Sequence, residues 1–309
     1  MVIPCFSNKI PDLNWIPQSA WDGKLPDNKE VYQFYLNEVQ RQVLLLGLGA
    51  DQESTNLYQS FKSLLIKYHK LIPDELVVDL RQLPENILYH CVLGLGLAEY
   101  DIGRYKTEVA PKNIPSKVKL VIPGISRQQQ GQHKEARATA ETMNRVCALV
   151  DAPSNVKTPA FLGRWAVESG EQYGYEVEVL EQNELEAKNF DALLAVGQGS
   201  INQPVLIIVR HQGDPTDSKN TTLGLVGKGV TFDTGGLSIK PSANMHLMKS
   251  DMGGAAAVLG AVELIAKRKL PIRVVGFVPT TDNSVGTAAI KPGDVIGSYS
   301  GKTIEVINT

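Results

Sequence analysis

Apolar runs and helical spacings alternate along the first half of the chain. An apolar run in Gln42–Gly49 predicts a buried strand, and shorter runs predict strands over Glu75–Leu80 and Lys117–Ile122. Between them, apolar residues recur at helical spacing over Ser54–Lys70 and Asn86–Tyr100. Because such alternation is typical of a parallel sheet covered by helices, the first half is predicted to be an α/β domain with a mainly parallel sheet.

The second half repeats the alternation. A helix is predicted from Thr158–Pro159, with threonine as N-cap and proline in the first turn, to about Gln172. A second helix with a small-residue start is predicted over Gly254–Lys269. The predicted strands are Tyr175–Leu180, Pro204–Val209, Thr222–Val230, Ile272–Val278 and Ile304–Ile307. This half is therefore also predicted to be α/β.

A polar segment separates the two halves. Ser126–Lys134 contains three consecutive glutamines and is interpreted as a linker, and Glu135–Val150 is an Ala-rich predicted helix. We expect an N-terminal α/β domain over residues 1–133, a linker helix over 134–150 and the first part of a second α/β domain over 151–309.

The composition narrows the class of protein. Hydrophobic residues make up 43% and charged residues 21%, and 31 Lys and Arg against 33 Asp and Glu give a net charge of −2. This balance argues against a dedicated binder of nucleic acid or of anionic membranes. No apolar run reaches the roughly 20 residues of a transmembrane helix, and the first residues lack the layout of a signal peptide. We therefore expect a cytoplasmic protein without membrane or nucleic-acid partners.

One stretch, Leu225–Ala257, concentrates residues that could carry chemistry. A predicted strand runs into a Gly-rich loop that holds Lys228, Asp233, Lys240 and Asp251, and then enters a helix that starts with Gly and Ala. Ligand sites in open α/β sheets lie beyond the carboxyl ends of strands. Carboxylates are hard donors for divalent metals, and a cation relieves the repulsion between two of them. This stretch is therefore a candidate metal site.

A structural interpretation of the same residues is open as well. Asp251 could be a helix N-cap, Asp233-Thr-Gly-Gly a tight turn, and Lys228 and Lys240 solvated side chains. Neither carboxylate belongs to a generic metal motif, and the sequence has no His-Glu-x-x-His or Cys-x-x-Cys. It also lacks a phosphate-binding loop and a Gly-x-Ser-x-Gly elbow.

Longer motifs resemble one family. The string Val-Gly-Lys-Gly-Val-Thr-Phe-Asp-Thr-Gly-Gly-Leu-Ser-Ile-Lys-Pro from Val226 resembles the signature of the leucine (cytosol) aminopeptidases, which remove the N-terminal residue of peptides with two metal ions. The resemblance extends over about Glu135–Thr309 and includes the stretches Asp151–Pro159, Asn244–Ala257, Lys291–Asp294 and Ser300–Thr303. The N-terminal 130 residues resemble the family in their α/β pattern and position.

The resemblance implies roles for individual residues. Lys228 matches an unprotonated amine ligand of one metal, Asp251 a ligand of that same metal, and Asp233 a carboxylate that bridges both metals. Lys240 matches a lysine that polarises the scissile carbonyl and stabilises the oxyanion. The implied nucleophile is a water activated by the metals. Met248 matches a wall of the substrate pocket, and Asn308 is assigned to substrate binding.

The family signature continues as Asn-Thr-Asp-Ala-Glu-Gly-Arg, whereas these residues end at Asn308–Thr309. The continuation would supply a ligand of the second metal, a bridging glutamate and an arginine that holds bicarbonate as a base. We therefore expect this chain to be part of a longer enzyme and to be inactive by itself. The alternative is a non-catalytic truncated homologue that acts as a binding or scaffolding protein.

The resemblance also implies cofactors and partners. The cofactors would be two divalent ions, zinc, manganese or magnesium, because all three suit carboxylate-rich sites. The expected substrates are peptides, with a leucine-type preference for the first residue. The complete protein is expected to form a homohexamer.

Overall fold

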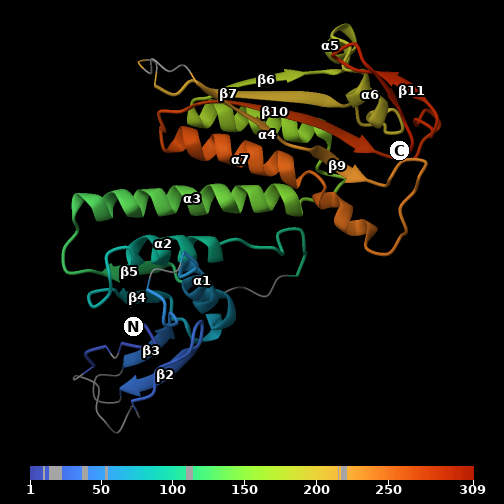
Figure 1. The fold of residues 1–309 in the computed structure, drawn as a ribbon. Helices are drawn as coiled ribbons and strands as arrows, with labels where there is room; N and C mark the ends of the chain where they lie inside the picture. Colours follow the sequence, from blue (N-terminus) through green and yellow to red (C-terminus); the bar gives the residue numbers. More distant parts are fainter. Residues whose placement is uncertain are drawn as a thin grey trace. The chain divides into compact units, whose positions relative to one another are not determined.

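The computed structural model describes residues 1–9, 11–13, 23–36, 41–52, 55–108, 114–214, 216 and 221–309 (Figure 1). The backbone divides into two compact units, residues 1–144 and residues 145–309. Each unit has its own sheet and its own buried apolar cluster.

The first unit is built on a five-stranded sheet in the order β2-β3-β1-β4-β5. Its strands are β1 (Val2–Cys5), β2 (Val31–Leu36), β3 (Arg41–Gly47), β4 (Glu75–Asp79) and β5 (Lys117–Val121). All neighbouring pairs are parallel except β2 and β3. The mainly parallel sheet predicted from the apolar runs is therefore confirmed, whereas β1 and β2 were not predicted.

Two helices, α1 (Tyr58–Lys67) and α2 (Ile87–Ala98), and the short 3-10 helix η3 (His69–Leu71) accompany this sheet. Ser54, the predicted start of the first helix, lies outside the described residues. Phe61 of α1 and Cys91 of α2 are fully buried in the same apolar cluster as the β3 and β4 side chains. Helical spacing therefore identified the face of α1 that enters this core, whereas α2 is buried along most of its residues.

The segment predicted as a linker is helical instead. α3 extends over Arg127–Asp151, so its first turns include most of the polar stretch. Ser126 explains the start, because Gln129 N–H donates to its Oγ at 3.1 Å and Ser126 N–H donates to Gln129 Oε1 at 3.0 Å. This reciprocal pair is a capping box, and glutamine is a good helix former. A polar composition therefore did not indicate a loop here.

The second unit has a mixed sheet in the order β6-β7-β10-β8, with β9 also paired to β10. The strands are β6 (Glu176–Leu180), β7 (Val205–His211), β8 (Thr222–Val226), β9 (Gly229–Asp233) and β10 (Arg273–Asn283). β7 is antiparallel to both neighbours, and β8 and β9 are parallel to β10. The single strand predicted over Thr222–Val230 is thus two strands. The last predicted strand appears as β12 (Thr303–Glu305), paired with β11 (Val295–Gly297).

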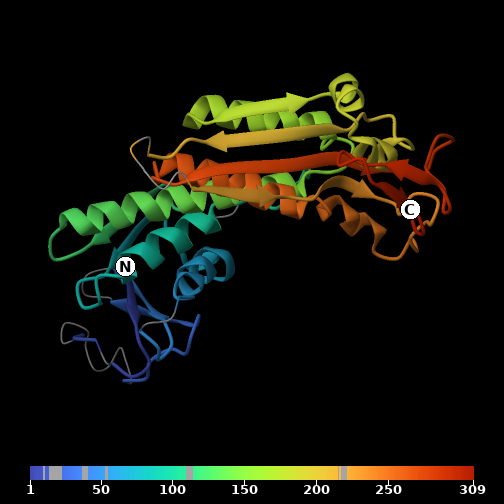
Figure 2. The ribbon, with the colours of Figure 1, turned by 45° about the horizontal axis from the view of Figure 1, so that its top comes forward.

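Helices α4 (Pro159–Tyr173) and α7 (Gly253–Lys267) cover one face of this sheet (Figures 1 and 2). Thr158 caps α4 as predicted, because its side chain accepts the Phe161 N–H and proline follows it. The remaining helices are α5 (Gln182–Ala187), α6 (Asp191–Gly197) and the 3-10 helix η4 (Met245–Ser250). No helix of the described residues is long and apolar enough to cross a membrane.

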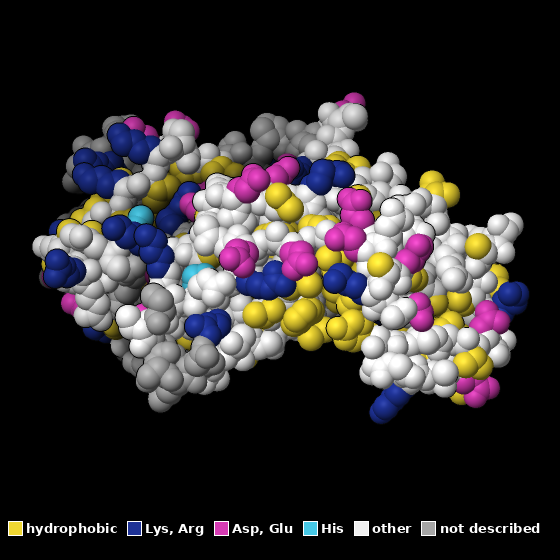
Figure 3. Space-filling model, turned by 90° about the horizontal axis from the view of Figure 1, so that it is seen from above, with side chains coloured by type: hydrophobic (Ala, Val, Ile, Leu, Met, Phe, Trp, Pro, Cys, Tyr) yellow, Lys and Arg dark blue, Asp and Glu magenta, His cyan; other side chains and the backbone are white. Residues whose placement is uncertain are grey.

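The other face of the sheet is more open. Val226 of β8 and Phe277 of β10 are paired across the strands and are 77% and 41% exposed. Arg210 and Glu178 form an ion pair of 2.6 Å between β7 and β6. Seen from this side, the surface shows apolar side chains among charged ones (Figure 3).

A buried carboxylate joins three helices in the second unit. Glu263 of α7 is fully buried, and its Oε2 contacts Arg145 Nε at 3.0 Å and accepts the Ser169 hydroxyl at 2.7 Å. Its Oε1 contacts Lys267 Nζ at 3.0 Å. The Arg145 and Lys267 cations also lie over the ring of Tyr173. Breaking one partner of such a network leaves uncompensated charge in the core.

We predict that Glu263→Gln lowers the free energy of unfolding by about 3 kcal/mol, because both cations lose their counter-charge. Chemical denaturation monitored by circular dichroism measures the change. Glu168→Gln, an exposed position on α4, is the matched control and should change the free energy by less than about 0.5 kcal/mol. Equal stability of the two variants would contradict a structural role for this network.

Candidate metal-binding site

Lys228, a candidate site residue, lies at the break between β8 and β9, where the backbone packs against the start of α7. Gly227 lies so close to α7 that a Cβ on it would be 2.6 Å from the Gly254 carbonyl oxygen, and a Cβ on Gly254 would be 3.0 Å from Lys228 N. The Ala255 N–H donates to the Lys228 carbonyl at 2.9 Å. This hydrogen bond satisfies a first-turn amide of α7 and ends the strand pairing at Lys228. A side chain at 227 would clash with the α7 backbone, and one at 254 would be tightly packed against Lys228.

Lys228 and Asp251 form one half of the site. Lys228 Nζ lies 2.9 Å from Asp251 Oδ2, and the side chains are 60% and 23% exposed. Asp251 ends η4 and precedes the N-cap of α7, which is Met252. It is therefore not the N-cap that the structural interpretation allowed. Its Oδ2 atom is buried and has no hydrogen bond of normal geometry, so the lysine ammonium is its cationic partner.

Asp233 and Lys240 form the other half. Asp233 Oδ1 accepts the Gly235 N–H at 2.9 Å and Asn283 Nδ2 at 2.8 Å, and Oδ2 contacts the Lys240 ammonium. Burial of Asp233 opposes ionisation, but the hydrogen bonds from Lys240, Gly235 and Asn283 and the lysine charge outweigh it. The pKa of this carboxyl is therefore lowered. The side chain is held as a carboxylate.

The turn after Asp233 brings Lys240 back to it. Gly235 and Gly236 both have positive φ, +88° and +62°, which favours glycine at these positions. The Lys240 N–H donates to the Thr234 carbonyl at 2.9 Å and closes the turn. The tight-turn interpretation of this stretch is thus correct for the backbone, and the turn also places Lys240 against Asp233.

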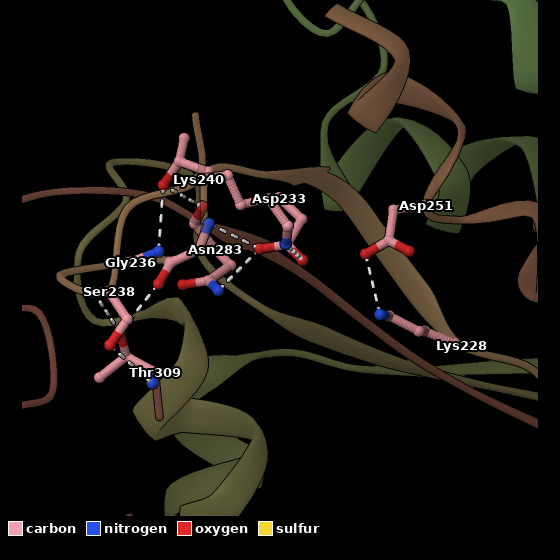
Figure 4. A network of polar contacts seen from close by, with 10 residues as sticks. Lys228, Asp233, Gly236, Ser238, Lys240, Asp251, Asn283 and Thr309 are labelled. Atoms are coloured by element: carbon pink, nitrogen blue, oxygen red, sulfur yellow. Dashed lines mark hydrogen bonds and ion pairs between the residues drawn. The ribbon is translucent and has the colours of Figure 1, made fainter. Parts of the chain in front are cut away.

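The candidate side chains therefore form two pairs (Figure 4). In the part of the chain that the structure describes, no hydrogen bond links Lys228 and Asp251 to Asp233 and Lys240. Among the described residues there is also no group of three or more His, Cys, Asp or Glu side chains that could hold a metal. The site consists of two carboxylates, each held by a lysine.

The other two candidate residues, Met248 and Asn308, lie in segments next to those that carry the lysine–aspartate pairs. Met248 is a half-buried residue of η4, three positions before Asp251. Asn308 is exposed, but its neighbour Thr309 is held against the turn. The Thr309 hydroxyl donates to the Gly235 carbonyl and accepts the Ser238 N–H, both at 2.8 Å.

Two residues of the site were not found from the sequence. Asn283 ends β10, which extends five residues beyond the predicted end at Val278, and it contacts Asp233. Because β9 and β10 are parallel neighbours, their carboxyl ends meet, and the polar end of the strand would have been the signal. The second residue, Lys157, lies in the Asp151–Pro159 stretch that resembles the family, but no role was assigned to it.

Lys157 connects the segment before Asp251 to the end of α3. It is fully buried, and its Nζ donates to the carbonyls of Val150 at 2.8 Å and Lys249 at 2.5 Å. Lys249 Nζ donates in turn to the Asp151 carbonyl at 3.0 Å. Burial lowers the pKa of Lys157 to about 8, and the charge of Lys249 contributes to this shift while Asp151 opposes it.

Comparison with known proteins shows the family to which this chain belongs. Residues 144–309 match the model of the cytosol aminopeptidase family, catalytic domain. A protein named "Probable cytosol aminopeptidase" from Clostridium perfringens is 37% identical over 279 residues, which are 86% of this chain and 56% of the relative. The chain therefore spans little more than half of that relative's length.

Solved structures agree over nearly the whole chain. The cytosol aminopeptidase from Coxiella burnetii is 26% identical with a TM-score of 0.82. The bottromycin maturation enzyme BotP in complex with Mn is 28% identical with a TM-score of 0.81. Each match covers 99% of this chain and 64% of the other. The fold is the mixed α/β fold of these solved relatives. The chain belongs to the cytosol aminopeptidase family.

We predict that the stability contributed by Lys157 depends on pH. Its folded pKa of about 8 is below the ordinary 10.5, so the unfolded state binds more protons between these values. Stability from this group is therefore full above pH 10.5 and is lost as pH falls through 8, with a slope of at most about 1.4 kcal/mol per pH unit. The test measures the unfolding free energy of the wild type and of Lys157→Met by denaturation from pH 7.5 to 10. The stability of the wild type relative to the variant should increase as pH rises. A constant difference would contradict the prediction.

Proposed function

We propose that this protein is a metal-dependent aminopeptidase that releases N-terminal residues from peptides. The observation that carries the proposal is the presence, at the two ends of β9, of two carboxylate–lysine pairs, Lys228 with Asp251 and Lys240 with Asp233. Membership in the cytosol aminopeptidase family supports it, as does a solved relative described in complex with Mn. As the chain spans about half of the curated relatives' length, the activity is proposed for the natural gene product.

The donor atoms fit a divalent cation. Asp251 Oδ2 is buried and has the Lys228 side chain as its cationic partner at 2.9 Å, a place that a divalent cation would take once Lys228 loses its proton. Asp233 is held ionised, and carboxylates suit zinc, manganese and magnesium. We propose that Lys228, as the free amine, and the carboxylates of Asp251 and Asp233 would hold the ions. When bound, such ions polarise a carbonyl and make a water more acidic.

The chain's own residues would do the remaining work. Lys240 is 38% exposed and held by Asp233, so its ammonium can reach a substrate while keeping its position. A fixed positive charge beside a scissile carbonyl stabilises the negative charge that develops on its oxygen. Met248, half-buried on η4, would form a wall for the first side chain of the peptide, and Asn308 would contact the substrate.

The finer features are proposed from the family resemblance. They are a leucine-type preference, a cytoplasmic location, a homohexamer and a bicarbonate base. Asp-Ala-Glu-Gly-Arg, the implied source of the other metal ligands, does not occur in residues 1–309. We therefore propose that these residues alone do not turn over substrate. Absence of turnover by the natural gene product would favour the alternative, a binding or scaffolding protein.

We predict that Asp251→Asn weakens Mn²⁺ binding, because it removes a proposed ligand. The loss should exceed the about 10- to 100-fold that removal of a supporting residue costs. Isothermal titration of the natural gene product with Mn²⁺ measures it, and Glu171→Gln on the exposed side of α4 is the charge-matched control. Unchanged affinity in Asp251→Asn would refute this ligand assignment.

We predict that Lys240→Gln lowers kcat by about 100- to 1,000-fold with a smaller effect on KM, because the lost charge acts on the transition state. Hydrolysis of leucine p-nitroanilide by the Mn²⁺-loaded natural gene product is the assay. Lys302→Gln removes an exposed lysine and should leave both constants unchanged. A Lys240→Gln variant with wild-type kcat would remove Lys240 from the mechanism.

A further inference from the structure

A β-bulge sets the register between the two strands that end at the site. Thr281 of β10 pairs with Val230 of β9, but the next pair is Asn283 with Asp233. β9 therefore has one more residue than β10 between these pairs. Bulges of this kind redirect side chains next to functional sites. Without the extra residue, Phe232 would be opposite Asn283, and Asp233 would point to the other face of the sheet.

The end of β10 is held firmly around Asn283. The Asn283 carbonyl accepts the N–H and the hydroxyl of Thr234, both at 2.9 Å. The preceding residue, Asp282, is buried and accepts Asn202 Nδ2 at 2.6 Å and the hydroxyls of Ser200 and Thr231. The Asn283 backbone is thus fixed on both sides.

The Asn283 side chain is directed at Asp233. Its Nδ2 donates to Asp233 Oδ1 at 2.8 Å, beside the donation from Gly235 N–H. On the other side, Asn283 Oδ1 would be 3.0 Å from a Cβ on Gly236, so the glycine leaves room for the amide. An amide donor orients the carboxylate without bringing a positive charge that would compete with a metal ion.

We propose that Asn283 is a positioning residue that fixes the orientation of the Asp233 carboxylate for metal binding, a role that rests on the proposed function. Supporting residues around metal ligands set ligand orientation, and their loss weakens metal binding by about 10- to 100-fold. Asn283 acts through Asp233 and does not itself contact the metal.

The test compares Mn²⁺ affinity in the wild-type natural gene product and in four variants. Asn283→Leu removes the donor, and Asn283→Ala removes both the donor and the bulk of the side chain. Both should bind Mn²⁺ about 10- to 100-fold more weakly than the wild type by isothermal titration. Asn283→His keeps a ring N–H donor and should recover most of the affinity.

Asn202→Ala is the matched control, because it loosens the same strand end through Asp282 without touching Asp233. It should lower the melting temperature of the metal-free protein and leave the Mn²⁺ affinity unchanged. Affinity in Asn283→Leu equal to the wild type, or a loss in Asn202→Ala as large as in Asn283→Leu, would overturn the positioning role while the proposed function stands. A wild type that binds no Mn²⁺ would overturn both.

Discussion

The close packing of the start of α7 against the break between β8 and β9 is the constraint on which the site depends. Two glycines allow the backbones to approach, and the Ala255 amide on the Lys228 carbonyl fixes them. This single contact decides that Lys228 precedes β9 rather than lying inside a longer strand. It also decides that Asp251, just before α7, faces Lys228. A side chain at Gly227 would clash with the α7 backbone, so the helix and the strand could not approach this closely.

Several parts of the fold could be predicted because local signals agreed with the tertiary structure. Continuous apolar runs identified β3 and β7, and Thr158 before Pro159 identified the start of α4. The failures have physical causes. The polar glutamines were interpreted as a linker, but they form the first turns of α3. Capping by Ser126 and the helix propensity of glutamine favour the helix there. Thr222–Val230 was predicted as one strand interrupted by glycines, and the break at Gly227–Lys228, where α7 packs against the backbone, was not predicted.

Only part of the candidate site could be predicted from the sequence. The motif around Lys228, Asp233, Lys240 and Asp251 is contiguous, so one stretch of sequence was enough to point to it. Asn283 is 50 residues from Asp233, and only the pairing of β9 with β10 makes them neighbours. Lys157 is 92 residues from Lys249, and although its stretch was noted in the sequence, their contact was not predicted. Residues that hold a site in place come from elsewhere in the fold, because the sheet and helices provide the rigid points.

The distance along the chain between these partners has a consequence for biosynthesis. A ribosome adds about 5–20 residues per second, so Asn283 is made about 3–10 s after Asp233. Thr309, 71 residues after Ser238, follows later still. During this interval the carboxylate of Asp233 lacks the partner that orients it, and β9 lacks its neighbour in the sheet. The pair of Asp233 and Asn283 therefore forms only after β10 has been made, and the candidate site is assembled after its own contiguous stretch of sequence has left the ribosome.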